Sequence, residues 1–132
     1  MQIEDNLPRF PRDLGVRLVS VAPELVVGEM TVADWHGNRN GVMHGGAIMA
    51  FADTLGGVAA AARLADTDRT TTLESKTNFL RAIPIGTTIT GRCEPLHAGR
   101  RTEVWQTTIL REDGKPAAVV TQTQLTLRDA QD

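Results

Sequence analysis

The feature that most constrains the fold is a long apolar segment, residues 46–64, that carries a single acidic side chain. Ala, Ile, Met, Leu, Val and Gly make up most of it, and its ionisable residues are Asp53 and, near its end, Arg63. Apolar residues occupy every face of a helix over this segment, so the pattern predicts a helix buried nearly all round. An ionised carboxylate there is costly unless it is paired, hydrogen-bonded or facing a wet pocket. Asp53 therefore needs an explanation.

Two interpretations of Asp53 compete. In one, it is a buried polar residue satisfied by neighbouring backbone or by an arginine. In the other, it is a general base or nucleophile in a cleft, with a reactivity set by partial desolvation. Its spacing from His44-Gly45-Gly46 favours the second interpretation. Asp53 lies about two helical turns beyond Gly46 and so returns to nearly the same face of the helix.

The two glycines at the start of this helix suit the binding of a carbonyl group. The first N–H groups of a helix lack internal partners and carry the positive end of its dipole. Paired glycines allow a substrate to approach Gly45 and Gly46 closely. A carbonyl oxygen polarised there, with a carboxylate further along the same face, is an arrangement suited to acyl transfer.

The rest of the chain is typical of strands, with apolar-rich or alternating runs separated by polar or Gly/Pro-containing turns. The expected strands are Gly15–Val21, Leu25–Val32, Thr70–Leu80, Thr87–Leu96, Thr102–Arg111 and Ala117–Leu127. In the last strand, Val120, Gln122, Gln124 and Thr126 share one face. One long apolar helix packed against five or six mainly antiparallel strands is an α+β fold.

The motif Asn38-x5-His-Gly-Gly, followed by Asp53 nine residues after the histidine, resembles the hotdog-fold acyl-CoA thioesterases of the phenylacetic acid degradation (PaaI-like) type. Further segments fit the same family in the same order: Phe-Ala-Asp-Thr-Leu at 51–55, Asn-Phe-Leu-Arg at 78–81, Ile-Gly-Thr-Thr-Ile at 85–89 and Gly-Arg-Arg-Thr at 99–102. The resemblance spans about residues 14–128. It implies a curved sheet wrapped around a buried helix, and hydrolysis of an acyl-CoA thioester.

The resemblance also implies roles for single residues. Asp53 matches the catalytic carboxylate, and the Gly45 N–H matches the group that polarises the thioester carbonyl. Asn38 matches a residue that orients water or the thioester, and His44 one that fixes the turn before the helix. Thr72 aligns with a hydroxyl position that holds the water, supplied by a neighbouring subunit.

For coenzyme A, the resemblance implies two binding segments, residues 79–84 and 97–102. The expected substrate-binding residues are Gly46, Thr54, Phe79, Leu80, Arg81, His97, Gly99, Arg100, Arg101 and Thr102. The arginine pair 100–101 could also be plain surface, but phosphate binding is the preferred interpretation. There are two departures from the family pattern. Gly57 replaces a hydroxyl residue of some relatives, so the site relies on Thr72 or Thr54, and Ala82 replaces a proline.

Composition sets further bounds. With 132 residues the chain is expected to be a single domain, residues 1–13 being a short extension. A net charge of −2 gives no general attraction to nucleic acid or acidic membranes. Cys93 is the lone cysteine, fits a reducing compartment and is expected to serve packing. The N-terminus does not resemble a signal peptide, so a cytoplasmic location is expected.

Several alternatives remain at this stage. His36, His44 and Asp53 lack a dependable metal spacing, and no metal or bound cofactor is implied. A hotdog enoyl-CoA hydratase would need an Asp–His pair across the thioester. A non-catalytic acyl-CoA-binding protein would use the same cleft without needing Asp53. The resemblance further implies a homo-oligomer, a dimer or dimer of dimers, with the active site shared between subunits.

Overall fold

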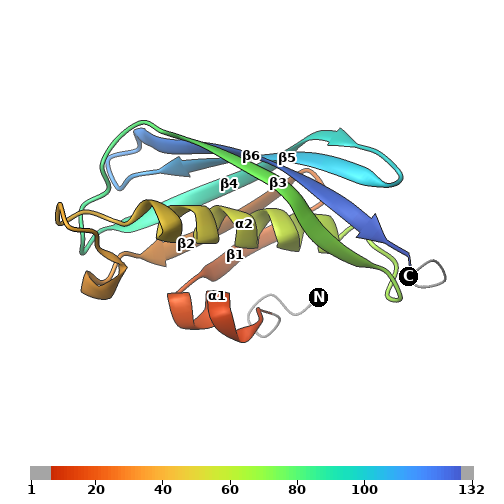
Figure 1. Ribbon diagram of the computed structural model, residues 1–132, viewed down its shortest axis with the longest axis horizontal. Helices are drawn as coiled ribbons and strands as arrows, with labels where there is room; N and C mark the ends of the chain where they lie inside the picture. The colour runs from red at the N-terminus through yellow and green to blue at the C-terminus, as the bar shows by residue number, and fades with distance from the viewer. Residues whose placement is uncertain (1–6, 129–132) are drawn as a thin grey trace.

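The computed structural model describes residues 7–128, and within them one long helix lies against a curved, six-stranded sheet (Figure 1). The helices are α1 (Arg9–Leu14), the 3-10 helix η1 (Asp34–His36) and α2 (Gly45–Ala61). The strands are β1 (Arg17–Ala22), β2 (Leu25–Thr31), β3 (Arg69–Phe79), β4 (Thr88–Ala98), β5 (Thr102–Leu110) and β6 (Pro116–Leu127). Their order is β1-β2-β4-β5-β6-β3, and each neighbouring pair is antiparallel. The predicted α+β architecture is confirmed.

The strands β5 and β6 place alternate side chains against α2. Burial alternates along both strands, as expected for a sheet with one covered face. The covered face of β6 carries Val120, Gln122 and Gln124, which the sequence placed on one strand face without indicating which face is covered. Two of these three residues are amides, so a polar row runs through an otherwise apolar interface.

The inner side of α2 forms the centre of the core. Ile48, Phe51 and Leu55 are buried against the sheet together with neighbouring alanines. The sheet can approach closely because it has glycines opposite the helix. A Cβ at Gly28 or Gly91 would overlap the Leu55 side chain. The glycines of the sheet therefore leave the space that the large side chains of the helix fill.

The outer side of α2 corrects a prediction. The helix was expected to be buried nearly all round and to run to Leu64, but it ends at Ala61, and Gly46, Asp53 and Ala61 are exposed. The sheet covers only one side of the helix, and small residues occupy much of the other. Within residues 7–128, no helix has both the length and the apolarity needed to span a membrane.

Helix α1 was not predicted from the sequence. It lies beside α2 (Figure 1), with Pro11 and Leu14 buried. Pro8 at its N-cap and Gly15 at its C-cap, where φ is 104°, are the signals that mark its ends. The expected N-terminal extension, residues 1–13, thus contains a helix in its described part, and residues 1–6 lie outside the described residues.

Candidate active site

The start of α2 leaves one backbone donor free. His44 caps the helix, because its Nδ1 accepts from the Gly46 N–H at 2.8 Å. Ala47 and Ile48 donate to the His44 carbonyl at 3.0 and 3.1 Å. Over residues 7–128, the structure gives no acceptor for the Gly45 N–H. The expected role of His44 in the turn is therefore confirmed, and the Gly46 N–H, engaged with His44, is not the group left for a substrate.

The Gly45 cavity, of about 360 Å³, opens beside this donor. It is lined by Asn38, Met43, Gly45, Ile48, Phe79, Leu80, Arg81, Ala82 and Ile83. A Cβ at Gly45 would meet the Phe79 ring at 3.3 Å. Asn38 Oδ1 accepts from two backbone N–H groups of its own turn, those of Asn40 and Val42. The Asn38 amide nitrogen is thus the part of the side chain left to donate to a ligand.

The Asp53 cavity, of about 480 Å³, lies along the outer side of α2. It is lined by Leu7, Pro8, Phe10, Pro11, Ala50, Asp53, Thr54, Gly57, Val58 and Ala61. Among the described residues of this lining, Asp53 is the one that is ionisable, so its carboxylate faces a largely apolar space. The Thr54 hydroxyl is already engaged, donating to the Ala50 carbonyl at 2.8 Å.

Two neutral side chains of the sheet hold the Asp53 carboxylate. The Thr72 hydroxyl lies 2.6 Å from Oδ1, and the Gln122 amide donates to the same oxygen at 3.2 Å. Thr72, which was expected to reach the site from a neighbouring subunit, thus contacts Asp53 of its own chain. This contact forms because Thr72 pairs with Gln124 in the β3–β6 ladder, on the sheet face that packs against α2.

Each chain holds its predicted site residues in two separate groups. Asp53 lies eight residues beyond Gly45, a rise of about 12 Å that is too long for both to reach one thioester carbonyl. The two expected coenzyme A segments are also apart. Phe79 pairs with Ala118 of β6, whereas Thr102 pairs with Leu125. These two positions on β6 are about 23 Å apart along the strand, and Figure 1 shows the two loops at opposite ends of the sheet.

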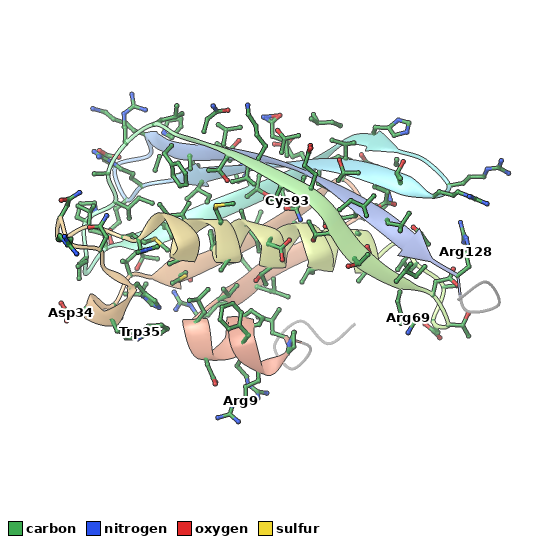
Figure 2. All side chains as sticks on the ribbon, in the orientation of Figure 1. Arg9, Asp34, Trp35, Arg69, Cys93 and Arg128 are labelled. Atoms are coloured by element: carbon green, nitrogen blue, oxygen red, sulfur yellow. The ribbon has the colours of Figure 1, made fainter. Side chains whose placement is uncertain are left out.

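The turn between β4 and β5 lies within the predicted coenzyme A segment, residues 97–102, and hydrogen bonds hold it from two sides. The Gly99 N–H donates to the Thr102 carbonyl at 2.9 Å, and the Arg128 guanidinium donates to the Arg100 carbonyl at 2.5 Å. Arg128 also pairs with Asp68, at the end of the molecule where Figure 2 labels it beside Arg69. His97, Arg100 and Arg101 are exposed at this turn.

Other residues singled out in the sequence have structural roles. Cys93 is fully buried (Figure 2), and burial raises the pKa of its thiol to about 11, in keeping with the expected packing role. His36 accepts from the Ala33 N–H and contacts the Leu14 carbonyl through its other ring nitrogen. Trp35 lies against His36 and is 66 % exposed.

Sequence reasoning missed part of the Asp53 surroundings. It placed Gln122 and Gln124 on one strand face but gave them no role, although two amides at buried alternate positions are an unusual signal. It also missed that the N-terminal segment contributes to the cavity, through Phe10 and Pro11 of α1 and through Leu7 and Pro8 before it. That packing is a tertiary contact without a local sequence signature.

Comparison with known proteins agrees with this architecture. The family model of the thioesterase superfamily matches residues 40–118. The proofreading thioesterase EntH of Cronobacter turicensis is 31% identical over 102 residues, 77% of this chain and 74% of the relative. The 1,4-dihydroxy-2-naphthoyl-CoA hydrolase of Escherichia coli is 30% identical over 112 residues, 85% of this chain and 79% of the relative.

A solved structure supports the fold. The PaaI protein from the phenylacetic acid degradation operon of Escherichia coli superimposes with a TM-score of 0.82 at 24% identity, covering 87% of this chain and 81% of that one. The chain belongs to the thioesterase superfamily. It has the hotdog fold of the PaaI-like type and is an enzyme that hydrolyses thioesters.

Proposed function

We propose that this enzyme hydrolyses acyl-CoA thioesters, with Asp53 as the catalytic carboxylate and the Gly45 N–H as the donor to the thioester carbonyl. The observation that carries the proposal is the position of Asp53, which within residues 7–128 is the one ionisable residue lining a largely apolar cavity of about 480 Å³. A relative of similar length is named as a hydrolase of an aromatic acyl-CoA, which supports the same substrate class.

The chemistry needs a carboxylate, a carbonyl-polarising donor and water. The Gly45 N–H stabilises the negative charge that develops on the carbonyl oxygen. Asp53 either removes a proton from the attacking water or attacks the carbonyl carbon itself, forming an anhydride that water then opens. In both routes the carbon–sulfur bond breaks, the thiol of coenzyme A leaves and a free carboxylic acid remains.

A second copy of the chain completes the site. The rise of about 12 Å between Gly45 and Asp53 supports a pairing in which one subunit supplies Gly45 and Asn38 and its partner supplies Asp53 and Thr72. A two-fold axis between the copies would then form two equal sites. This arrangement retains the shared active site expected from the resemblance but moves Thr72 to the Asp53 side of it.

The edge of the sheet at β3 supports such a pairing. β3 is eleven residues long, stands at the end of the strand order and pairs with β6 alone in the described chain. It exposes Leu73 and Phe79 by 57% and 54%, and Leu80 directly after it by 53%. A long edge strand with exposed apolar side chains is a template for pairing with another chain. Association of two such dimers into a tetramer stays a prediction.

The two cavities suggest how the substrate divides. The apolar lining of the Asp53 cavity suits the acyl group, which must place its carbonyl near the carboxylate. Coenzyme A needs polar and cationic contacts. Exposed groups of this kind lie around Phe79–Arg81 and in the β4–β5 turn that carries Arg100 and Arg101. With two copies, each nucleotide would meet the Phe79 loop of one chain and Arg100–Arg101 of another.

The alternatives have less support. A hydratase would need His44 opposite Asp53, but Nδ1 of His44 caps α2. A binding protein without catalysis would have the same cavities, but the chain belongs to a superfamily of enzymes that hydrolyse thioesters.

Asn or Ala at position 53 should lower kcat on aromatic or medium-chain acyl-CoA substrates by about 10²–10⁴-fold, because general-base contributions have that size. The fold should persist, since an asparagine oxygen can still accept from Thr72 and Gln122. Release of the free thiol measures kcat, and binding of a non-hydrolysable acyl-CoA ether measures retained affinity. Wild-type turnover in folded Asp53→Asn would contradict the mechanism and show that a group other than Asp53 carries the reaction.

The shared site can be tested by subunit mixing. Asp53→Asn and Gly45→Val chains, each inactive alone, are unfolded together and refolded. A mixed dimer has one site with both defects and one with neither, so roughly a quarter of wild-type activity should return.

The matched control is a mixture of Asp53→Asn and Thr72→Ala chains. Because Thr72 contacts Asp53 of its own chain, every site in these mixed dimers retains one defect, and no recovery is expected. Recovery in the control but not in the first mixture would reverse the assignment of the two half-sites.

Gly57 should control the size of the acyl group. A Cβ at Gly57 would meet no atom of residues 7–128 within 4 Å, so a side chain there fills the Asp53 cavity without disturbing the core. Gly57→Leu should raise KM for benzoyl-CoA by about tenfold or more and affect acetyl-CoA much less. Gly57→Ala serves as the intermediate case. An equal change for both substrates would show that the acyl group lies elsewhere.

Replacing Arg100 and Arg101 by Ala should raise KM for acyl-CoA with little change in kcat, because phosphate contacts stabilise ground and transition states alike. The effect should vanish with acyl-pantetheine, which lacks the nucleotide. Arg17→Ala/Arg92→Ala removes the same charge on the β1–β2–β4 side of the sheet and is the control. An unchanged KM at low salt would assign the pair to plain surface.

A further inference from the structure

A buried amide network lies behind Asp53, and no step of the proposed reaction uses it. Gln122 and Gln124 are 1% and 2% exposed on adjacent inward positions of β6. The Gln122 nitrogen donates to Asp53 Oδ1 at 3.2 Å and to Gln124 Oε1 at 2.9 Å. The Gln124 nitrogen donates to the Thr70 hydroxyl at 3.0 Å. Gln124 of β6 and Thr70 of β3 are thus linked to the carboxylate of α2 through the Gln122 amide.

The Thr72 hydroxyl alone cannot hold Asp53. It lies 2.6 Å from Asp53 Oδ1 and also 2.6 Å from Gln124 Oε1, yet it has a single proton to donate. At any moment, one of these two oxygens does not receive the Thr72 proton. Gln122 has two N–H protons and contacts both acceptors, so Gln122 is the group that satisfies them together.

The orientation of the Gln122 amide is determined by its neighbours. Exchanging its oxygen and nitrogen would place a carbonyl oxygen against both the carboxylate and Gln124 Oε1, two groups that cannot donate to it. In the orientation present, Gln122 Oε1 is buried and has no hydrogen-bond partner within the described residues. An unpaired buried acceptor lowers the stability of the fold. Packing of the core alone therefore does not account for this arrangement.

Gly56 provides the space for this amide. A Cβ at Gly56 would overlap the amide group of Gln122. Gly56 lies one helical turn beyond Asp53, so the Gln122 side chain crosses α2 at this glycine to reach the carboxylate. Glycine inside a helix lowers stability relative to alanine, which again points to a requirement other than core stability.

We propose that Gln122, seated on Gly56, is the positioning residue for Asp53: it holds Oδ1 so that Oδ2 stays directed to the thioester. This inference rests on the proposed catalytic role of Asp53. Within residues 7–128, Oδ2 has no recorded hydrogen bond, which leaves it free for the water or the carbonyl carbon. Gln124 acts one step further out, orienting Gln122 and sharing the Thr72 proton.

The test compares Gln122→Met, which keeps the length and burial of the side chain but removes the N–H groups, with Thr107→Val. Thr107 is a fully buried polar residue of β5 that lies opposite Cys93 of β4, so it controls for a change in the core of the same sheet. Gln122→Met should lower kcat about 10- to 100-fold, the loss of a hydrogen bond to a charged group, with KM within about twofold of wild type. Thr107→Val should leave both constants unchanged.

Two measurements separate positioning from general damage. In crystals, the Asp53 carboxylate should occupy one conformer in the wild type and more than one in Gln122→Met, a result that needs no substrate. In an Asp53→Asn background, adding Gln122→Met should cause no further loss of kcat. A single Asp53 conformer in Gln122→Met, or wild-type kcat in Gln122→Met while Asp53→Asn is inactive, overturns the proposal. Full activity of Asp53→Asn instead removes the proposed function.

If Gln122→Met does not fold, Gly56→Ala supplies the test, because it keeps the amide and displaces it. Gly56→Ala should lower both the melting temperature and kcat. The double variant Gly56→Ala/Gln122→Ala removes the overlap and should regain the melting temperature without regaining kcat. Recovery of both quantities would make Gln122 a packing residue and overturn the proposal.

Discussion

The structure depends on the packing of α2 against a sheet that covers only one of its sides. On the covered side, Phe51 and Leu55 fill the space opposite glycines of β2 and β4. On the other side, Ala50, Gly57 and Ala61 are too small to close the surface, and α1 lies beside them to form a cavity. Large residues on one side and small ones on the other let a single helix provide both the core and the wall of a substrate site.

Asp53 lies between the covered and the uncovered side of α2. This position accounts for what the sequence predicted about the residue and for what it missed. Alternation along β6 and the apolar run of α2 determined the elements and placed Gln122 and Gln124 on one strand face. They could not show that the sheet stops short of Asp53, because how far a sheet wraps depends on strand order and register. The same pairing, Thr72 opposite Gln124, brings Thr72 to Asp53 within one chain, where resemblance alone implied a neighbour.

The separation of Gly45 from Asp53 has a simple origin in helix geometry. A rigid helix keeps two groups eight residues apart at about 12 Å, whatever the side chains do. The His-Gly-Gly motif and the aspartate can be recognised in sequence, but recognition says nothing about whether they serve the same substrate molecule. In the proposed dimer, a two-fold axis between antiparallel copies of α2 would turn this fixed separation into two complete sites, each with its donor and its carboxylate from different chains.

The partners of Asp53 leave its carboxylate charged and contact only one of its two oxygens. A guanidinium beside the carboxylate would form an ion pair and occupy both oxygens in a bidentate arrangement. Thr72 and Gln122 are neutral, contact the same oxygen and approach from the sheet side alone. They fix the direction of the carboxylate without neutralising its charge. In the mechanism we propose, the amide network holds the group in place and leaves its second oxygen for chemistry, and the cost of that arrangement is a Gln122 oxygen without a hydrogen-bond partner among residues 7–128.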